Sequence, residues 1–292
     1  MKFIVLSIFL SFFVSQFCFS QSQLEIKSST DSTNIPFVTI TYIKNDSVVG
    51  GTYANEKGIA TLDLKKNFDR INISHLSYFS KTIDRHSNVS SVIHLEEKTQ
   101  ELAEVIISNK PSKPTWIGAE LDKKNAFISA HRGMEISTLI RGNETLSGKK
   151  ITQLKFEIKR RKELYAAVLK IHFYDATTTL PGQLINATQD ITVIIDAKTK
   201  GTITVDLEGY SIYLLNEGVF VGIEWLGLVD ADHNLLQNDT NNDCSLGFNR
   251  VEKNNLTLIR NKFSNGDWHP FKFYGFENDD VFVVPALSLE VE

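Results

Sequence analysis

Short runs in which apolar and polar side chains alternate are the feature that most constrains the fold of this chain. Successive side chains of a β-strand point to opposite faces of a sheet, so a run of this kind predicts a strand with one buried face. Across residues 24–108, no stretch has the spacing of apolar residues that is typical of an amphipathic helix, and strand-like runs dominate residues 115–292 as well. The pattern therefore predicts an all-β protein. The residues that share an apolar face are Val38, Ile40 and Tyr42 in one run, and Leu154, Phe156 and Ile158 in another.

The strand-like runs fall into two groups. Residues 21–108 and residues 115–292 each hold several runs, with turn signals between them. Residues 109–114, which separate the groups, contain two prolines, and these prevent regular strand pairing and stiffen the chain. We therefore predict two independent domains joined by a linker over 109–114. The first is a small β-sandwich over 21–108, and the second is a larger antiparallel, jelly-roll-like β-sandwich over 115–292.

Two segments of the larger domain carry specific expectations. Residues 219–226 are apolar on both faces, which is typical of a central strand. Within them Trp225 has the same parity as Val221 and Ile223, so we expect its ring to lie in the core. Residues 134–141 fit either a strand or a short helix, and we favour a strand.

The N-terminus has the pattern of a secretory signal peptide. Lys2 precedes an uncharged apolar run over residues 3–14, and the small residue Ser20 follows. The run is shorter than the roughly 20 residues that span a bilayer, so an uncleaved anchor is the less favoured alternative. Lipidation of Cys18 is another, but bulky and polar residues precede that cysteine. We predict that residues 1–20 are removed as a signal peptide, and that the protein is exported and is periplasmic or associated with the outer membrane.

Net charge, hydropathy and cysteine content indicate which partners and which covalent cross-links the mature chain can have. The chain has a formal net charge of −4, and this balance disfavours general nucleic-acid binding, which requires a basic surface. No apolar run beyond the signal peptide approaches transmembrane length, so we expect no transmembrane segment in the mature chain. Cleavage would leave Cys244 as the remaining cysteine. No intramolecular disulfide can then form, and each domain depends on its own core.

Several short motifs of the small domain occur together in one known family. They are Ile35-Pro36-Phe37, Gly51-Thr52, Asn55 to Gly58, Ile73 to Tyr78, and Leu102 to Ile107. With these motifs, residues 24–108 resemble the carboxypeptidase regulatory-like domain, a small transthyretin-like sandwich, although Ser77 stands where that family usually has glycine. The resemblance implies an exported envelope protein, because such domains often precede TonB-dependent outer-membrane receptors. It implies a scaffold and not a chemistry.

An acidic loop in the larger domain is the candidate metal site. Asp230, Asp232 and Asn234 stand at alternate positions, as at the start of a calcium-binding loop. Leu235 occupies the sixth position, where an EF-hand loop needs glycine, and Asn241 occupies the twelfth, where it needs glutamate. The candidate is therefore a looser Ca²⁺ site in a sandwich loop, and a solvated loop is the alternative. No other cofactor is predicted.

Trp268, flanked by Asp267 and His269, is the candidate ligand-binding side chain. These residues lie at a strand entry next to a proline. A ring held there can face solvent beside hydrogen-bonding groups, which is what sugar recognition requires. A tryptophan that caps the end of the sandwich is the alternative, and Trp116, near another strand end, presents the same choice.

No catalytic constellation is recognisable in the sequence. His94 and Glu97 match the H-x-x-E spacing of some zinc sites, but residues three apart on a strand point to opposite faces. The neighbours of Cys244 are acidic or amide-bearing, which does not favour a reactive thiolate. We therefore predict a non-catalytic binding protein of the bacterial cell envelope, with carbohydrate or an envelope protein as its partner.

Two other function classes stay open at this point. One is a glycosidase-like hydrolase without a recognisable motif, which predicts two carboxylates that face one cleft. The other is a structural accessory of an outer-membrane receptor, which predicts an exposed apolar patch or a bare edge strand. Carbohydrate binding predicts an exposed aromatic platform on the larger sandwich instead.

Overall fold

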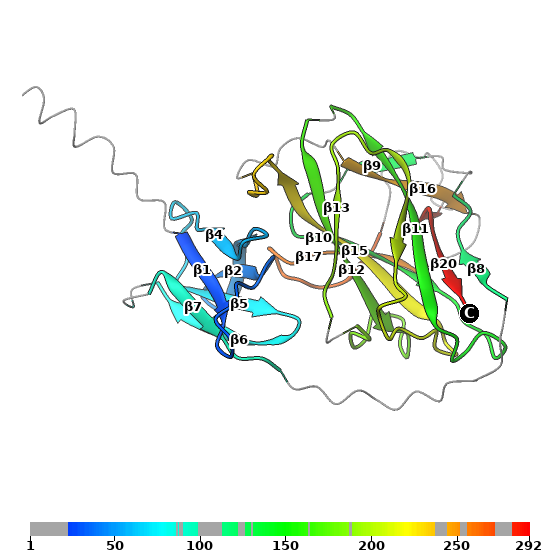
Figure 1. Ribbon diagram of the computed structural model, residues 1–292, viewed down its shortest axis with the longest axis horizontal. Helices are drawn as coiled ribbons and strands as arrows, with labels where there is room; N and C mark the ends of the chain where they lie inside the picture. Colours follow the sequence, from blue (N-terminus) through cyan, green and yellow to red (C-terminus); the bar gives the residue numbers. More distant parts are fainter. Residues whose placement is uncertain are drawn as a thin grey trace, which may run out of the picture.

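The protein is all-β, as its alternating sequence pattern predicts (Figure 1). The computed structural model describes residues 23–85, 87, 90–98, 113–121, 126–129, 131–162, 164–186, 189–236, 244–251, 256–271 and 282–292. Within these residues every regular element is a β-strand, and no helix is long and apolar enough to cross a membrane. The predicted signal peptide and most of the predicted linker lie outside the described residues.

The small sandwich consists of two sheets. A four-stranded sheet has the order β3 (Ser47–Tyr53), β2 (Thr39–Lys44), β5 (Arg70–His75), β6 (Tyr78–Asp84), and a three-stranded sheet has the order β4 (Ile59–Thr61), β1 (Gln23–Ser28), β7 (Val92–Leu95). β1 pairs with β7 in parallel and with β4 in antiparallel orientation. The apolar faces of both sheets form one core, which includes Ile26, Val38, Ile40, Tyr42, Ile73 and Leu95.

A tight turn over residues 55–58 connects β3 to β4. The amide of Gly58 donates a hydrogen bond of 3.0 Å to the carbonyl oxygen of Asn55. Gly58 has a φ of +72°, a conformation that glycine adopts without steric strain. The Asn55 side chain accepts hydrogen bonds from the amides of Lys57 and Ile59. The turn is therefore held rigidly, and it projects toward the larger sandwich.

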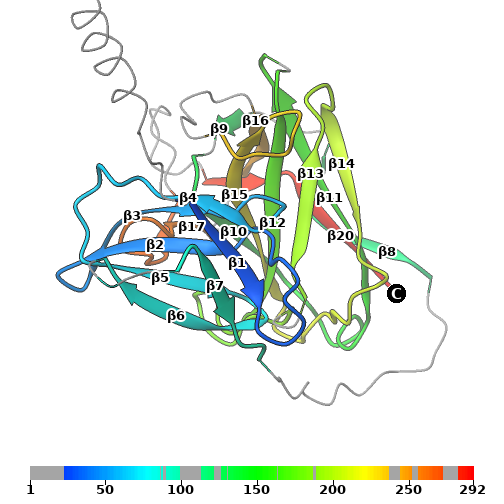
Figure 2. The same cartoon turned by 60° about the vertical axis from the view of Figure 1, so that its left-hand side comes forward.

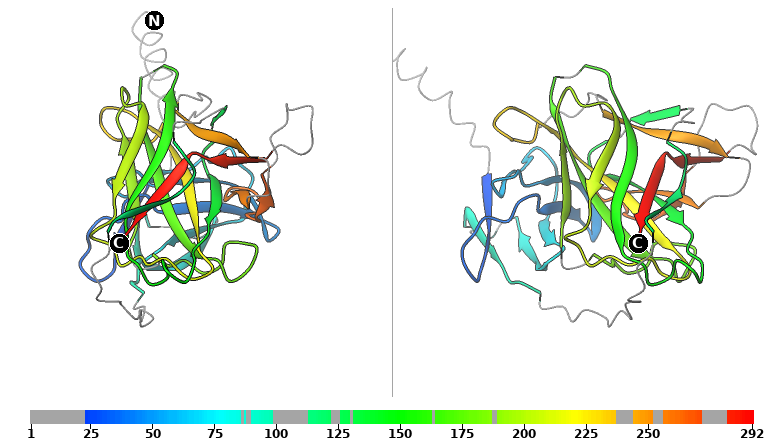
Figure 3. Two further views of the ribbon diagram at one scale, coloured as in Figure 1. Left: turned by 90° about the vertical axis from the view of Figure 1, so that its right-hand side faces the viewer. Right: turned by 45° about the vertical axis from the view of Figure 1, so that its right-hand side comes forward.

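The larger sandwich packs a six-stranded sheet against a seven-stranded one, and Figure 3 shows these strands from two sides. The six-stranded sheet has the order β13 (Ile191–Ile195), β12 (Ala166–Asp175), β15 (Val219–Val229), β10 (Met134–Ile140), β17 (Thr257–Asn261), β18 (His269–Pro270). The seven-stranded sheet has the order β19 (Phe282–Pro285), β16 (Cys244–Val251), β11 (Ile151–Arg160), β20 (Leu287–Val291), β8 (Thr115–Gly118), with β14 (Gly201–Asp206) paired to β11 and β9 (Ala126–Ser129) paired to β16.

Strand β15 is central, as its sequence predicts. It pairs with β10 on one edge and with β12 on the other. Trp225 is only 4 % exposed and belongs to the core between the two sheets, so its predicted core position is confirmed. Residues 134–140 form β10, and the strand favoured there is confirmed as well.

A β-bulge lets β15 serve two hydrophobic clusters. Val168 of β12 pairs with Gly227, whereas the next residue of β12 pairs with Trp225, so Leu226 is the extra residue. Trp225 and Leu228 therefore point into the core between the sheets, while Leu226 and Val229 pack on the outer face of the six-stranded sheet. The bulge thus places two apolar side chains on the outer face of the six-stranded sheet, a face that would be polar if β15 were apolar on its core side alone.

The small sandwich lies against this outer face (Figure 2). Phe37 and Tyr53 of the small sandwich form one buried cluster with Val168, Leu226 and Val229. The two sandwiches have separate cores and share this third cluster. The sequence did not predict a buried junction between the domains, and their independent folding stays a prediction.

Candidate functional site

The outer face of the six-stranded sheet carries an unusual row of buried charged side chains. Strand pairing places Lys170 of β12 opposite Glu224 of β15, and Glu224 opposite Glu135 of β10. His172 follows on the same face of β12. All four residues are at most 5 % exposed. Charged groups are seldom buried without partners, because desolvation penalises them strongly.

Glu224 accepts hydrogen bonds at both carboxylate oxygens. Its Oε1 accepts from the Tyr53 hydroxyl at 2.5 Å, and this bond joins the two sandwiches. Its Oε2 accepts from Lys262 Nζ at 2.7 Å and lies 2.6 Å from His172 Nε2. Burial raises the pKa of Glu224, but Lys262 and His172 outweigh burial and hold it well below the usual range. Glu224 is therefore a carboxylate.

Glu135 is enclosed in a similar way. Its Oε1 accepts from the Tyr174 hydroxyl at 2.6 Å, and its Oε2 accepts from Arg260 Nε at 2.9 Å and Nη2 at 2.6 Å. Burial raises the pKa of Glu135, yet the neighbouring His172, Arg260 and Lys262 outweigh it, so the pKa lies below its ordinary value. Glu135 and Glu224, with these partners, are called the charge cluster below.

The two tyrosines of the charge cluster act as hydrogen-bond donors. Burial raises the pKa of Tyr53 well above its ordinary value, and Glu224 beside it adds to the shift. Burial and Glu135 do the same for Tyr174. Both hydroxyls therefore keep their protons, as donation to a carboxylate requires. The charge cluster balances two carboxylates with Arg260 and Lys262, and every oxygen of the two carboxylates accepts a hydrogen bond.

A glycine makes room for the charge cluster on β15. Gly222 pairs with Ser137 on one side and with His172 on the other. A Cβ at Gly222 would overlap the Oε1 atom of Glu135. Ser137 Oγ of β10 and His172 Nδ1 of β12 are buried without a hydrogen-bond partner among the described residues. The carboxylate of Glu135 lies over Gly222 of β15, the strand between β10 and β12, and it separates the two side chains. Ser137, His172 and Glu224 are therefore not arranged as an accessible nucleophilic triad.

The charge cluster also holds three groups that suit a metal ion. Ligand atoms of Glu135, His172 and Glu224 lie within 4.8 Å of one another. A cation at their centre would have to displace Arg260 and Lys262, which already neutralise both carboxylates. The donor set therefore fits the observed ion pairs better than a metal, and we assign the charge cluster to the docking of the two sandwiches.

A second ion cluster lies beside the first. Asp190 lies 2.6 Å from Lys170 Nζ and 2.7 Å from Nε2 of His75, which belongs to the small sandwich. Burial raises the pKa of Asp190, but Lys170 and His75 outweigh burial and lower it strongly. Each ion cluster therefore contains one contact between the sandwiches, from Tyr53 to Glu224 in the first and from His75 to Asp190 in the second.

Phe263 fills the space between the two sandwiches. Its ring centroid lies 4.9 Å from that of Tyr53. A Cβ at Gly51 of the small sandwich would overlap this ring, and a Cβ at Gly133 of the larger one would come within 2.6 Å of it. The two glycines therefore form a slot for Phe263, and the junction combines this apolar contact with the ion pairs.

The predicted calcium loop takes part in the same junction. Asp230 Oδ1 accepts hydrogen bonds from the amides of Asp232 and Asn234, at 3.0 and 2.8 Å. Asn234 Oδ1 accepts from Asn55 Nδ2 of the small sandwich at 3.1 Å, while the side chain of Asp232 is exposed. The structure thus brings Asp230 and Asn234 together and gives their oxygens another role. Calcium binding stays a prediction, and the acidic residues after 236 up to Asp243 lie outside the described ones.

The predicted sugar-binding residues lie at the edge of the charge cluster. Trp268 is half-buried, with its ring edge-on to Tyr174 at 6.0 Å between centroids. The Arg260 guanidinium lies 4.3 Å from the centroid of the Trp268 ring, so one face of the ring is already in contact. Asp267 and His269 are exposed. Sugar binding by Trp268 stays a prediction, but the ring also has a structural role beside Arg260.

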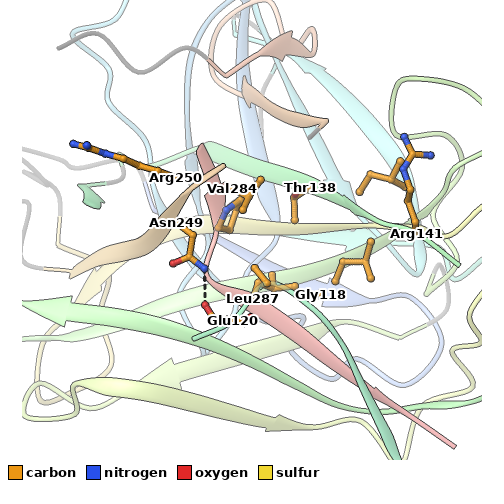
Figure 4. Close-up of a pocket in the computed structure, with 12 residues that line it drawn as sticks. Gly118, Glu120, Thr138, Arg141, Asn249, Arg250, Val284 and Leu287 are labelled. Atoms are coloured by element: carbon orange, nitrogen blue, oxygen red, sulfur yellow. Dashed lines mark hydrogen bonds between the residues drawn. The ribbon is translucent and has the colours of Figure 1, made fainter. Parts of the chain in front are cut away.

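A cleft opens elsewhere, between β10 of the six-stranded sheet and strands β8, β16, β19 and β20 of the seven-stranded one (Figure 4). It has a volume of about 510 Å³. Its walls combine apolar side chains with a few polar ones, and Arg141 and Arg250 lie at opposite ends (Figure 4). The lining residues are Gly118, Ala119, Glu120, Thr138, Leu139, Ile140, Arg141, Asn249, Arg250, Val284, Pro285 and Leu287.

Asn249 is a buried polar residue of the cleft lining, as is Thr138. It is 6 % exposed, and its Nδ2 donates to the carbonyl oxygen of Glu120. That bond fixes the orientation of the amide and leaves Oδ1 buried without a hydrogen-bond partner among the described residues. A buried acceptor without a donor is unfavourable, but this oxygen is fully enclosed, so a ligand in the cleft does not contact it in this conformation.

A second hollow, of about 530 Å³, shares Gly118, Ala119 and Glu120 with the cleft. Trp116 lines it and is 39 % exposed. Lys155 Nζ lies 3.9 Å from the centroid of the Trp116 ring, a cation–π contact. The cleft and this hollow together form a continuous candidate binding surface along the end of β8.

Sequence reasoning did not identify the main residues of either region. Glu224 is the one charge within the apolar strand β15, and that contrast could have singled it out. The lining of the cleft comes from separate segments, and no local pattern connects them. No family model matches this chain, and no curated protein matches it either. The resemblance to the carboxypeptidase regulatory-like domain therefore rests on its motifs alone.

Proposed function

We propose that this chain is a non-catalytic, exported binding protein of the bacterial cell envelope, and that its larger sandwich binds carbohydrate. The observation that carries the proposal is the cleft of about 510 Å³ with the Trp116 hollow beside it. Ligand sites of this size usually combine apolar walls with a few fixed polar groups, as this surface does.

The chemistry of the surface suits a sugar. An indole ring packs against the apolar face of a pyranose, and hydroxyl groups need both donors and acceptors around it. Trp116 supplies the exposed ring, and Arg141 and Arg250 supply donors. Trp268 remains the second candidate ring.

A glycosidase function receives less support from the side chains. A retaining or inverting mechanism needs a carboxylic acid that can give its proton to the substrate, and such acids have raised pKa values. The close pair of buried carboxylates, Glu135 and Glu224, has lowered pKa values, and every carboxylate oxygen of the pair already accepts a hydrogen bond. The pair therefore fits docking better than acid–base catalysis.

The small sandwich would hold the binding domain in a fixed orientation in the envelope. The support is the junction, in which Tyr53, His75 and Asn55 of the small sandwich each bond to the larger one. The export signal over residues 1–20 and the family resemblance of residues 24–108 favour the periplasm or the outer membrane as the location of such a protein.

The test is a glycan array probed with the chain that begins at Gln21. We expect binding to at least one glycan class, loss of that binding in Trp116→Ala, and an unchanged melting temperature in this variant. Trp268→Ala tests the second candidate ring. Phe79→Ala is the matched control, because Phe79 is an exposed aromatic residue of the small sandwich. An array without any bound glycan, or full binding by both tryptophan variants, would contradict the proposal.

A further inference from the structure

Two aromatic side chains stand on the outer face of the seven-stranded sheet, Trp116 of β8 and Phe127 of β9. Their chain neighbours Ile117 and Ile128 pack against the core between the two large sheets. Successive side chains of a strand point to opposite faces, so Trp116 and Phe127 point away from the core. The small sandwich covers the outer face of the other large sheet, and this face lies on the far side of the larger sandwich from it (Figure 1).

The two rings are aligned along β11. Strand pairing through β20 places Trp116 level with Gln153 of β11. Phe127 pairs with Gly247 of β16, and a Cβ at Gly247 would lie 2.9 Å from the Cβ of Glu157, so Phe127 is level with Glu157. Gln153 and Glu157 are four residues apart, which is about 13 Å along a strand. The sheet therefore holds two rings on one face, in a line parallel to β11.

A lysine of β11 contacts each ring. Nζ of Lys155 lies 3.9 Å from the centroid of the Trp116 ring, and Nζ of Lys159 lies 5.2 Å from that of Phe127. These cation–π contacts hold the rings against the sheet. Trp116 is nevertheless 39 % exposed, and Phe127 is half-buried. A ligand on this face would meet an apolar ring and an amine donor at each of two places.

The face beside the rings is polar and carries both signs of charge. Along β11, Lys155 and Lys159 alternate with Glu157, and the paired strand β14 adds the exposed Thr202 and Thr204. Threonine hydroxyls both donate and accept hydrogen bonds, as the hydroxyl groups of a sugar require. Alternating charges give no extended field of one sign that would select an ionic ligand. The ligand that fits this face is therefore uncharged and rich in hydroxyl groups.

We propose that this face binds an extended, neutral β-1,4-linked glycan chain that runs parallel to β11, with Trp116 and Phe127 packed against two of its sugar rings. The inference rests on the proposed carbohydrate function and specifies its ligand. A monosaccharide is too short to reach both aromatic rings, whereas a chain of several units reaches both. The β-1,4 linkage keeps a chain extended, as two contacts on a line require, and an α-1,4 linkage coils it.

Isothermal titration tests the inference with cellohexaose, mannohexaose and xylohexaose, each measured beside its own β-1,4-linked disaccharide. We expect at least one hexasaccharide to bind about tenfold tighter or more than its disaccharide, because only the longer chain packs against the second ring. Maltohexaose, which has α-1,4 linkages, is the control for chain shape and should bind no tighter than the disaccharides. Equal affinities for hexasaccharide and disaccharide in all three pairs would overturn the inference.

Variants of the second ring separate the inference from the function on which it rests. Phe127→Leu keeps apolar bulk and removes the ring, so it should lower hexasaccharide affinity about tenfold and change disaccharide affinity little. Phe127→Trp keeps a ring and should retain the affinity, and Phe79→Ala, on the small sandwich, should change neither. Unchanged hexasaccharide affinity in a folded Phe127→Leu variant would confine the ligand to the Trp116 hollow and leave carbohydrate binding intact. An empty glycan array would overturn both.

Discussion

Glu224 is a buried charge that depends on its neighbours. It is buried in the most apolar strand, and Tyr53, His172 and Lys262 together occupy its carboxylate. Removing one partner of a buried ion pair leaves an uncompensated charge, which destabilises proteins by about 3–5 kcal/mol. Glu224 is therefore one of the residues on which the stability of the junction depends.

We expect Glu224→Gln to lower the free energy of unfolding by about 3 kcal/mol, because Lys262 and His172 lose their closest anionic partner. Tyr53→Phe removes one neutral donor and should cost about 1–3 kcal/mol, since it leaves a carboxylate oxygen unsatisfied. Urea unfolding measures both. The matched control is Glu208→Gln, at an exposed position, which should change stability by less than about 0.5 kcal/mol. A similarly small effect for Glu224→Gln would show that the charge cluster contributes little.

At the scale of the strands, β15 is in close contact with its neighbours at Gly222. Gly222 leaves space that the Glu135 carboxylate occupies, and a Cβ there would overlap it. We expect Gly222→Ala to destabilise the protein by about 1–3 kcal/mol, as overpacking does. Gly209→Ala is the control, because nothing lies within 4 Å of a Cβ at that position. Equal melting temperatures for the two variants would mean that the charge cluster rearranges without strain.

Strand positions could be predicted from sequence because alternation is a local property. Residues 154, 156 and 158 of β11 are buried as predicted, and Lys170 and His172 lie opposite the apolar face of β12. The alternation does not reveal that a second domain covers this polar face. It also cannot reveal the bulge at Leu226, which depends on pairing with β12.

The candidate sites were harder to predict than the strands. The cleft joins β10 to segments around β8, β16 and β19, and only the packing of two sheets brings these together. Asp230 and Asn234 were singled out for their oxygens, and the structure gives those oxygens hydrogen bonds within the loop and to Asn55. The sequence shows that the loop with Asp230 and Asn234 is polar, but the hydrogen bond from Asn55 to Asn234 forms only when the two domains dock.

At the scale of the whole molecule, the two sandwiches share one buried junction, so a cut in the linker should not separate them. Lys110 and Lys113 each precede proline, so a specific protease site inserted after Asn109 is the suitable target. We expect the two fragments to elute together in size-exclusion chromatography at pH 7. Elution as separate fragments would show that the junction is too weak to hold without the linker.

The association should weaken in acid. Asp190, Glu135 and Glu224 have lowered pKa values in the folded protein. A carboxyl group whose pKa is lowered in the folded protein stabilises the folded state at pH values above its ordinary pKa, near 4. This stabilisation is lost as the pH falls from there toward the pKa of the folded state. The cut protein should therefore begin to dissociate below about pH 4. Asp190→Asn should associate more weakly at pH 7 and lose less on acidification.

Cys244, at the start of β16, is 4 % exposed. If residues 1–20 are removed, it is the only thiol of the chain, and a thiol reagent can reach it only when the larger sandwich transiently opens. β16 also carries Asn249 and Arg250 of the cleft. Any compound that occupies the cleft should slow the modification of Cys244 in proportion to its saturation of the site. The rate of thiol labelling therefore gives a screen that responds to ligands of any chemical class, charged or neutral.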